Sequence, residues 1–98
     1  MAFASLSAAG GADIFNSAAG TLAVSAVAAQ TAVLPEGQYH VWCSVECFIK
    51  VGATANDVTA ANGYIVRADT TVAVPVRPGH RIGAIAGGAG TLSYHKVG

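Results

Sequence analysis

The sequence predicts one all-β domain, and three observations lead to that expectation. Apolar and polar side chains alternate along several stretches, which is the period of strands buried on one face. Turn-forming Pro, Gly, Asn and Asp residues recur about every 8–12 residues, as they do in small sandwiches and barrels. No helical period follows residue 20. We therefore expect a small antiparallel β-sandwich of jelly-roll-like form, with seven or eight short strands.

The first 20 residues differ from the rest of the chain. They have no clean period, and several glycines interrupt them. We take residues 1–20 as an N-terminal arm and residues 21–98 as the sandwich domain. Alanine favours helix, so a short helix over 12–19 with Asp13 at its cap or first turn is one possibility. An extended arm is the other.

The next stretches alternate with increasing clarity. Strands are expected over 21–28 and 30–34, before a Pro-Glu-Gly turn at 35–37. In 39–51 every second residue is apolar. This stretch is long for one strand, so we expect a bend, or a break between two strands near 44–46. Its apolar face consists of Tyr39, Val41, Cys43, Val45, Cys47, Ile49 and Val51.

A polar loop and a second group of strands complete the domain. Residues 52–63 are rich in Asn, Asp, Thr and Gly, which is typical of a loop. Pro75 lacks an N–H donor, which places its strand at a sheet edge or at a bulge. The glycine-rich stretch 87–90 predicts a hairpin loop. The expected strands cover 64–68, 71–77, 81–86 and 91–97.

Charge is scarce and unevenly placed. Ten of the 98 residues are charged, five of each sign, or 10% where soluble domains carry about 25%. Asp13 is the only one among the first 35 residues. Nucleic-acid binding needs clustered Lys and Arg, so this class of function is not expected. Disorder caused by charge repulsion is not expected either, because 53% of the residues are hydrophobic. We expect other chains to cover much of this surface, above all the first third.

The two cysteines, Cys43 and Cys47, are expected to be buried, reduced thiols of a chain made in a cytosol. On one straight strand they would lie about 13 Å apart. A disulfide needs Cα atoms within about 7 Å. No apolar run is long enough to predict a membrane span, and a secretory signal would need basic residues that the N-terminus lacks.

No catalytic or metal-binding pattern emerges from the sequence. His40, His80 and His95 lack the spacing of zinc ligands, and strand alternation turns His40 away from both thiols. No G-x-S-x-G motif is present. We expect a protein that is not an enzyme and that holds no cofactor or metal. A small metal-dependent enzyme is the least favoured alternative.

Aromatic residues offer another alternative. Trp42 and Phe48 share the outer face of the 39–51 stretch, where aromatic rings could stack against sugars. Packing beneath a loop or against a neighbouring chain explains the same two residues.

Two segments, LPEGQYHVWCSVECFIKVG (34–52) and GYIVRADTTVAVPVRPGHRIGAIAGGAGTLSYHKVG (63–98), carry a family resemblance. Their order of turns, strands and a polar loop resembles that of small β-rich virion proteins of tailed bacteriophages. The resemblance implies a β-sandwich that decorates or cements a capsid, often as a trimer where major capsid subunits meet. It carries over no catalytic residue.

The expected function is therefore structural. We expect a virion protein, made in the host cytoplasm and located on the capsid surface. Its partners would be copies of itself, as a trimer, and the major capsid protein, with neither nucleic acid nor membrane. The alternative is a carbohydrate- or receptor-binding module of a phage tail or fibre. The side chains expected at the contacts are Phe3, Leu6, Ile14, Phe15, Trp42 and Phe48.

Overall fold

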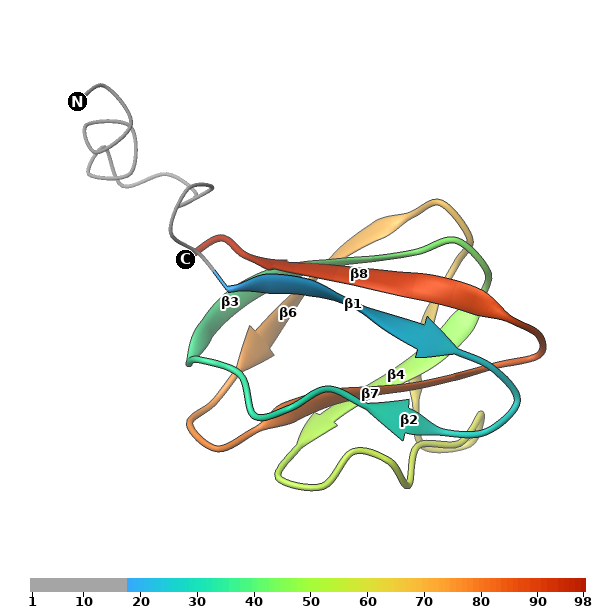
Figure 1. The fold of residues 1–98 in the computed structure, drawn as a ribbon, viewed down its shortest axis with the longest axis horizontal. Coiled ribbons are helices and arrows are strands. Elements are labelled where there is room, and N and C mark those ends of the chain that lie inside the picture. Colours follow the sequence, from blue (N-terminus) through green and yellow to red (C-terminus); the bar gives the residue numbers. More distant parts are fainter. Residues whose placement is uncertain (1–17) are drawn as a thin grey trace.

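Eight strands follow the stretches of alternating side chains (Figure 1). The computed structural model describes residues 18–98, and this part of the chain contains strands, turns and loops but no helix. The all-β prediction is therefore confirmed. The strands are β1 (Ala19–Val24), β2 (Ala29–Gln30), β3 (Gly37–Cys43), β4 (Cys47–Gly52), β5 (Tyr64–Val66), β6 (Thr71–Val76), β7 (Arg81–Ala86) and β8 (Gly90–Lys96).

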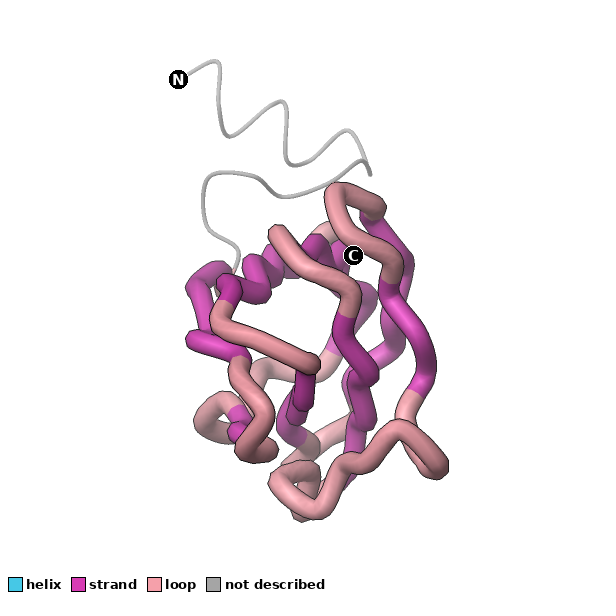
Figure 2. Tube along the Cα trace, turned by 90° about the vertical axis from the view of Figure 1, so that its right-hand side faces the viewer, coloured by secondary structure: helices cyan, strands magenta, loops and turns pink. Residues whose placement is uncertain are grey.

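The strands form two antiparallel sheets that pack against each other (Figures 1 and 2). Sheet A has the strand order β1-β8-β3-β6, and sheet B has the order β2-β7-β4-β5. The chain changes sheet at every connection except the one between β4 and β5. Eight strands wound in these two orders make a jelly roll, so the predicted sandwich is confirmed in its topology as well.

The inward-facing residues of both sheets form one apolar core. Alternation along β3 turns Tyr39, Val41 and Cys43 inward, and none of the three has exposed surface. Tyr39 is the largest fully buried side chain, and its hydroxyl donates to the Pro35 carbonyl at 2.7 Å. That bond satisfies the polar end of the ring. Burial, with a smaller contribution from the neighbouring Tyr94, raises the pKa of Tyr39.

The long alternating stretch is two strands in different sheets. β3 ends at Cys43 in sheet A, residues 44–46 turn the corner, and β4 begins at Cys47 in sheet B. Of the two alternatives expected for this stretch, a bend or a break near 44–46, the structure has the break. Two expectations that assumed a single strand are wrong. Cys43 and Cys47 lie in different sheets, on either side of a three-residue corner, instead of about 13 Å apart on one straight strand. Trp42 and Phe48 lie on the outer faces of different sheets.

Several boundaries also differ from the sequence prediction. β1 begins at Ala19, inside the predicted arm, because its backbone pairs with β8 from that residue on. Ala18 and Ala19 are therefore not helical, and the rest of the possible helix over 12–19 lies outside the described residues. The connection after β7 joins sheet B to sheet A, so it is not a hairpin within one sheet. Pro75 does lie on an edge strand, β6.

The loop between β4 and β5 folds back over the outer face of sheet B. Ala55 and Val58 in this loop are 0% and 1% exposed. The Ala55 N–H donates to the Gln30 Oε1 atom of β2 at 3.0 Å. Gly83 of β7 lies directly beneath, because a Cβ at this position would overlap the Ala55 carbonyl. Outward-facing apolar residues of sheet B are half-buried: Phe48, Ile65 and Ile85.

Candidate functional site

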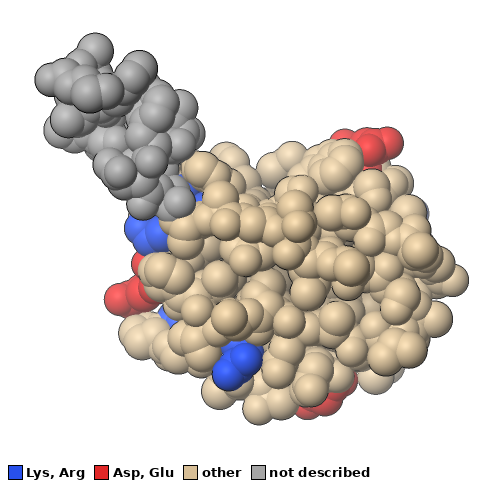
Figure 3. Space-filling model, in the orientation of Figure 1, with Lys and Arg blue, Asp and Glu red and all other residues tan. Residues whose placement is uncertain are grey.

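The outer face of sheet A carries no charged side chain. Alternation along its four strands turns twelve residues outward, and not one of them is Asp, Glu, Lys or Arg. In the space-filling view, a broad uncharged area extends over β1 and β8 (Figure 3). We call this surface the open face. Its residues are Ala19, Thr21, Ala23, Gln38, His40, Trp42, Thr71, Ala73, Pro75, Thr91, Ser93 and His95.

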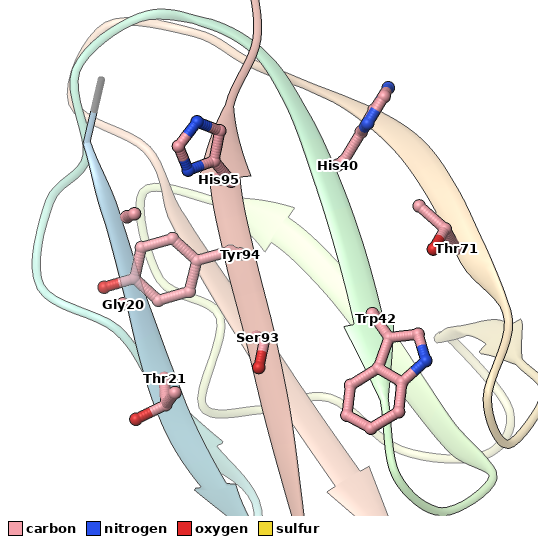
Figure 4. Close-up of a pocket in the computed structure, with 9 residues that line it drawn as sticks. Gly20, Thr21, His40, Trp42, Thr71, Ser93, Tyr94 and His95 are labelled. Atoms are coloured by element: carbon pink, nitrogen blue, oxygen red, sulfur yellow. The ribbon is translucent and has the colours of Figure 1, made fainter. Parts of the chain in front are cut away.

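A shallow hollow of about 590 Å³ lies on the open face (Figure 4). All four strands of sheet A contribute to it, so its shape is set by the sheet and by no single loop. The size falls within the range of small-ligand sites, although this hollow is open to solvent. Its lining residues are Ala19, Gly20, Thr21, His40, Trp42, Thr71, Ser93, Tyr94 and His95.

The register of β3 and β8 places the polar side chains of the hollow in pairs. His40 lies directly opposite His95, and Trp42 lies directly opposite Ser93. Side chains opposite each other in an antiparallel pair have Cβ atoms about 5 Å apart, so each pair forms one small patch. Figure 4 shows the two imidazoles at one end of the hollow and the indole at the other. The hydroxyl of Thr21 flanks them from β1.

His95 is the least satisfied polar group of the site. Its Nε2 atom is buried and has no hydrogen-bond partner among the described residues. His40, across the strand pair, is exposed. An imidazole nitrogen donates or accepts a hydrogen bond according to its tautomer, and leaving it unpaired and buried is costly. A ligand or neighbouring chain seated in the hollow would supply the missing partner.

Tyr94 and Gly20 form the floor of the hollow beside β1. The Tyr94 ring runs toward β1, and a Cβ at Gly20 would come within 2.6 Å of the Tyr94 hydroxyl oxygen (Figure 4). On its other side, the ring packs against Tyr39, with the two centroids 6.3 Å apart. Gly20 therefore leaves room for an aromatic ring that links the core to the open face.

The sequence-predicted contact residues are not brought together. Trp42 lines the hollow, whereas Phe48 is half-buried under the loop that covers sheet B, with its Cβ 2.7 Å from where a Cβ of Gly63 would lie. The other four lie outside the described residues: Phe3, Leu6, Ile14 and Phe15. Sequence reasoning missed the pairing of His40 with His95, since the two are distant in sequence and only the β3–β8 register unites them.

Two ion pairs of the described residues lie away from the open face. Lys50 pairs with Asp57 at 2.8 Å, and Arg67 pairs with Glu46 at 3.2 Å, both on the side of sheet B. Within residues 18–98, no three His, Cys, Asp or Glu side chains gather as a metal site would require. The same part of the chain has no helix suited to crossing a membrane. The hollow thus offers hydrogen bonds and an aromatic surface.

A second, smaller hollow of about 240 Å³ lies where the edges of the two sheets meet. It includes Tyr64, which is 65% exposed, and Pro75 of the edge strand β6. Its lining is mostly aliphatic, and it has no cluster of polar side chains. The open-face hollow is therefore the better candidate site.

Comparison of the chain with protein-family models, with curated proteins and with solved structures found no match.

Proposed function

We propose that this chain is a non-enzymatic structural protein of a phage particle, which decorates or cements the capsid shell and associates with copies of itself through the open face. The trimer and the contact with the major capsid protein belong to the same proposal. The jelly-roll topology supports it, since jelly rolls are common in viral capsid and lectin domains. Because one fold can serve many functions, association depends on the chemistry of the surface.

The observation that carries the proposal is the absence of charge from the open face. The centres of protein interfaces are depleted in Lys, Glu and Asp and enriched in aromatic residues. The open face has no charged residue and carries Trp42. Tryptophan is among the residue types that contribute most to binding energy at interfaces. Sheet B, by contrast, turns the charged Lys50 and Arg81 outward.

A matched pair of charge substitutions tests the proposal. Ala73→Lys adds a positive charge to the exposed centre of β6 on the open face, whereas Ala60→Lys adds one to the exposed loop over sheet B. The readouts are molar mass by light scattering and co-sedimentation with empty shells of tailed phages. We expect Ala73→Lys to dissociate the oligomer and weaken shell binding by tenfold or more, while Ala60→Lys behaves like the unmodified chain. The proposal would be contradicted if the unmodified chain were monomeric and did not co-sediment with the shells.

Truncation tests the contribution of the apolar N-terminal segment. The cut must leave Ala18 in place, because its carbonyl accepts a hydrogen bond from the Lys96 N–H at 2.8 Å. Removing residues 1–17 should weaken particle binding and leave the thermal unfolding of the sandwich intact. If the truncated chain bound particles as well as the full-length chain does, residues 1–17 would not be part of the contact surface.

Glycan binding in the open-face hollow is the second candidate, and one specific observation favours it. The Trp42 indole lies beside the hydroxyls of Ser93 and Thr71, and two imidazoles lie at the other end of the hollow. A stacking surface combined with hydrogen-bond partners is what sugars need. The measurement is a glycan array probed with the unmodified chain and with Trp42→Ala. Binding that Trp42→Ala abolishes, together with unchanged molar mass, would favour this candidate over self-association.

A further inference from the structure

The two cysteines occupy equivalent places on opposite sides of the sandwich core. Cys43 is the last residue of β3 in sheet A, and Cys47 is the first residue of β4 in sheet B. Both side chains point inward and have no exposed surface. Only three residues, which form the corner between the sheets, separate them along the chain. The fold thus brings together one thiol from each sheet.

The corner that connects the cysteines is held firmly in place. The Ser44 N–H donates to the Thr91 carbonyl at 3.0 Å, and the Thr91 N–H donates to the Ser44 hydroxyl oxygen at 2.9 Å. The Cys43 carbonyl accepts a bond from the Asp69 N–H at 2.8 Å. These bonds fix the backbone on the Cys43 side of the corner.

The thiols influence each other directly. Their hydrogen bond, then burial, then the charge of a Cys47 thiolate raise the pKa of the Cys43 thiol. The same hydrogen bond is the main effect on Cys47 and lowers its pKa, although burial and Glu46 oppose it. Cys47 is therefore the sulfur that more readily becomes a thiolate, which is the nucleophilic form.

We propose that Cys43 and Cys47 are a site of oxidative cross-linking, at which a hydroperoxide converts the two free thiols into a disulfide that joins sheet A to sheet B. The Cys47 thiolate attacks hydrogen peroxide, the O–O bond breaks, and hydroxide leaves, so that Cys47 becomes a sulfenic acid. The Cys43 sulfur, as it loses its proton, then displaces the sulfenic hydroxyl as water, and the S–S bond forms. The two thiols lose two electrons and two protons in total, and the peroxide is reduced to two water molecules.

Counting thiols in the unmodified full-length chain tests this proposal. The folded protein is treated with hydrogen peroxide, unfolded in guanidinium chloride and labelled with iodoacetamide. We expect both thiols to become unreactive together and the cysteine pair to lose about 2 Da. Dithiothreitol should restore both. Since oxidation of Met1 adds oxygen independently, the count uses the alkyl labels and not the total mass.

Other outcomes of this experiment overturn the proposal. Two thiols that remain fully labelled would show that the pair does not react, and oxidation to sulfinic acid without a disulfide would show that the sulfurs cannot meet. A disulfide-linked dimer on a non-reducing gel would place the bond between chains.

Variants separate pairing from ordinary thiol oxidation. In Cys43→Ala and Cys47→Ala the remaining thiol has no partner, so we expect peroxide to give no intramolecular bond in either chain. Circular dichroism establishes that each variant folds. In the unmodified chain, the cross-link should raise the thermal midpoint by roughly 8 °C, since closing even a short loop restricts the unfolded chain. If peroxide raised the thermal midpoint of the two variants by the same amount, the cross-link would not be the cause of the stabilisation.

Discussion

The two outer faces of the sandwich differ in what covers them. Sheet B turns Phe48, Ile65 and Ile85 outward, and the loop between β4 and β5 lies over them. Sheet A turns Trp42 and two histidines outward, and no loop of the described residues covers them. The charged pairs lie on the side of sheet B, which already has its cover. The comparison teaches that an apolar outer face is not by itself a contact surface for another chain. The outer face of sheet B is covered by a loop of its own chain, whereas the outer face of sheet A is not covered by any of the described loops.

The largest expected effect is a loss of stability when the loop that covers sheet B is displaced. A Cβ at Gly83 would overlap the Ala55 carbonyl, so Gly83→Ala must displace the loop. We expect the free energy of unfolding to fall by about 2–3 kcal/mol, as in overpacked cores, with no effect on association. The matched control is Gly87→Ala, because no atom lies within 4 Å of a Cβ there. Urea denaturation measures both variants, and equal stability would show that the loop does not press on sheet B.

The next effect concerns the open face. Trp42→Ala removes the aromatic surface of the hollow, and we expect self-association to weaken by about 2 kcal/mol, or roughly 30-fold, as at an interface hot spot. Tyr64→Ala removes an aromatic ring that is 65% exposed on sheet B and should leave association unchanged. Analytical ultracentrifugation compares the two. Equal weakening would remove the distinction between the faces.

A moderate loss of stability is expected from removing the Thr31 hydroxyl at the edge of sheet B. The buried Thr31 hydroxyl accepts a hydrogen bond from the Ile82 N–H at 3.1 Å and donates one to the Ala32 carbonyl at 2.7 Å. Thr31→Val keeps the shape and leaves both groups unpaired, so we expect a loss of about 1–2 kcal/mol in chemical denaturation. Thr70→Val, at an exposed turn, is the control and should change stability by less than about 0.5 kcal/mol. Similar losses would show that the side-chain bridge at this edge contributes little.

The smallest effect is a pH dependence within the cover of sheet B. A hydrogen bond from Lys50 lowers the pKa of the Asp57 carboxyl below its ordinary value of 3.8. A group with a lowered pKa in the folded state stabilises the fold above the unfolded value, and that contribution disappears as pH falls through the folded value. Asp57→Asn should therefore reduce the drop in thermal midpoint between about pH 5 and pH 2. An unchanged drop would show that this exposed pair does not hold the loop.

Local features of this fold were predictable from the sequence, and long-range ones were not. Alternation in 39–51 predicted extended structure over the residues of β3 and β4, with a bend or a break between them, because side-chain direction reverses at each residue of any strand. It could not assign the two strands to different sheets, since that depends on which partner each strand finds. The expected separation of Cys43 and Cys47 failed for this reason.

The candidate site shows the same division. Trp42 was recognised as an aromatic residue on an outer face, and its place in the hollow agrees with that. The facing histidines were not recognised as a pair, because β3 and β8 are far apart in sequence and their register is fixed by the packed core. Likewise, the polar loop at 52–63 was predicted as a loop, but nothing in its composition indicated that Ala55 and Val58 would bury the face of sheet B.

The pairing of β1 with β8 also determines where this domain accepts an attached label. Ala19 lies opposite His95, so the start of β1 and the end of β8 meet at the histidine end of the hollow (Figure 1). A fluorophore or affinity tag attached at the start of β1 or at the end of β8 would crowd the hollow. Gly87 and Gly88 lie at the far end of β8, are exposed and have open space around them. Inserting a label there leaves the hollow clear for binding measurements.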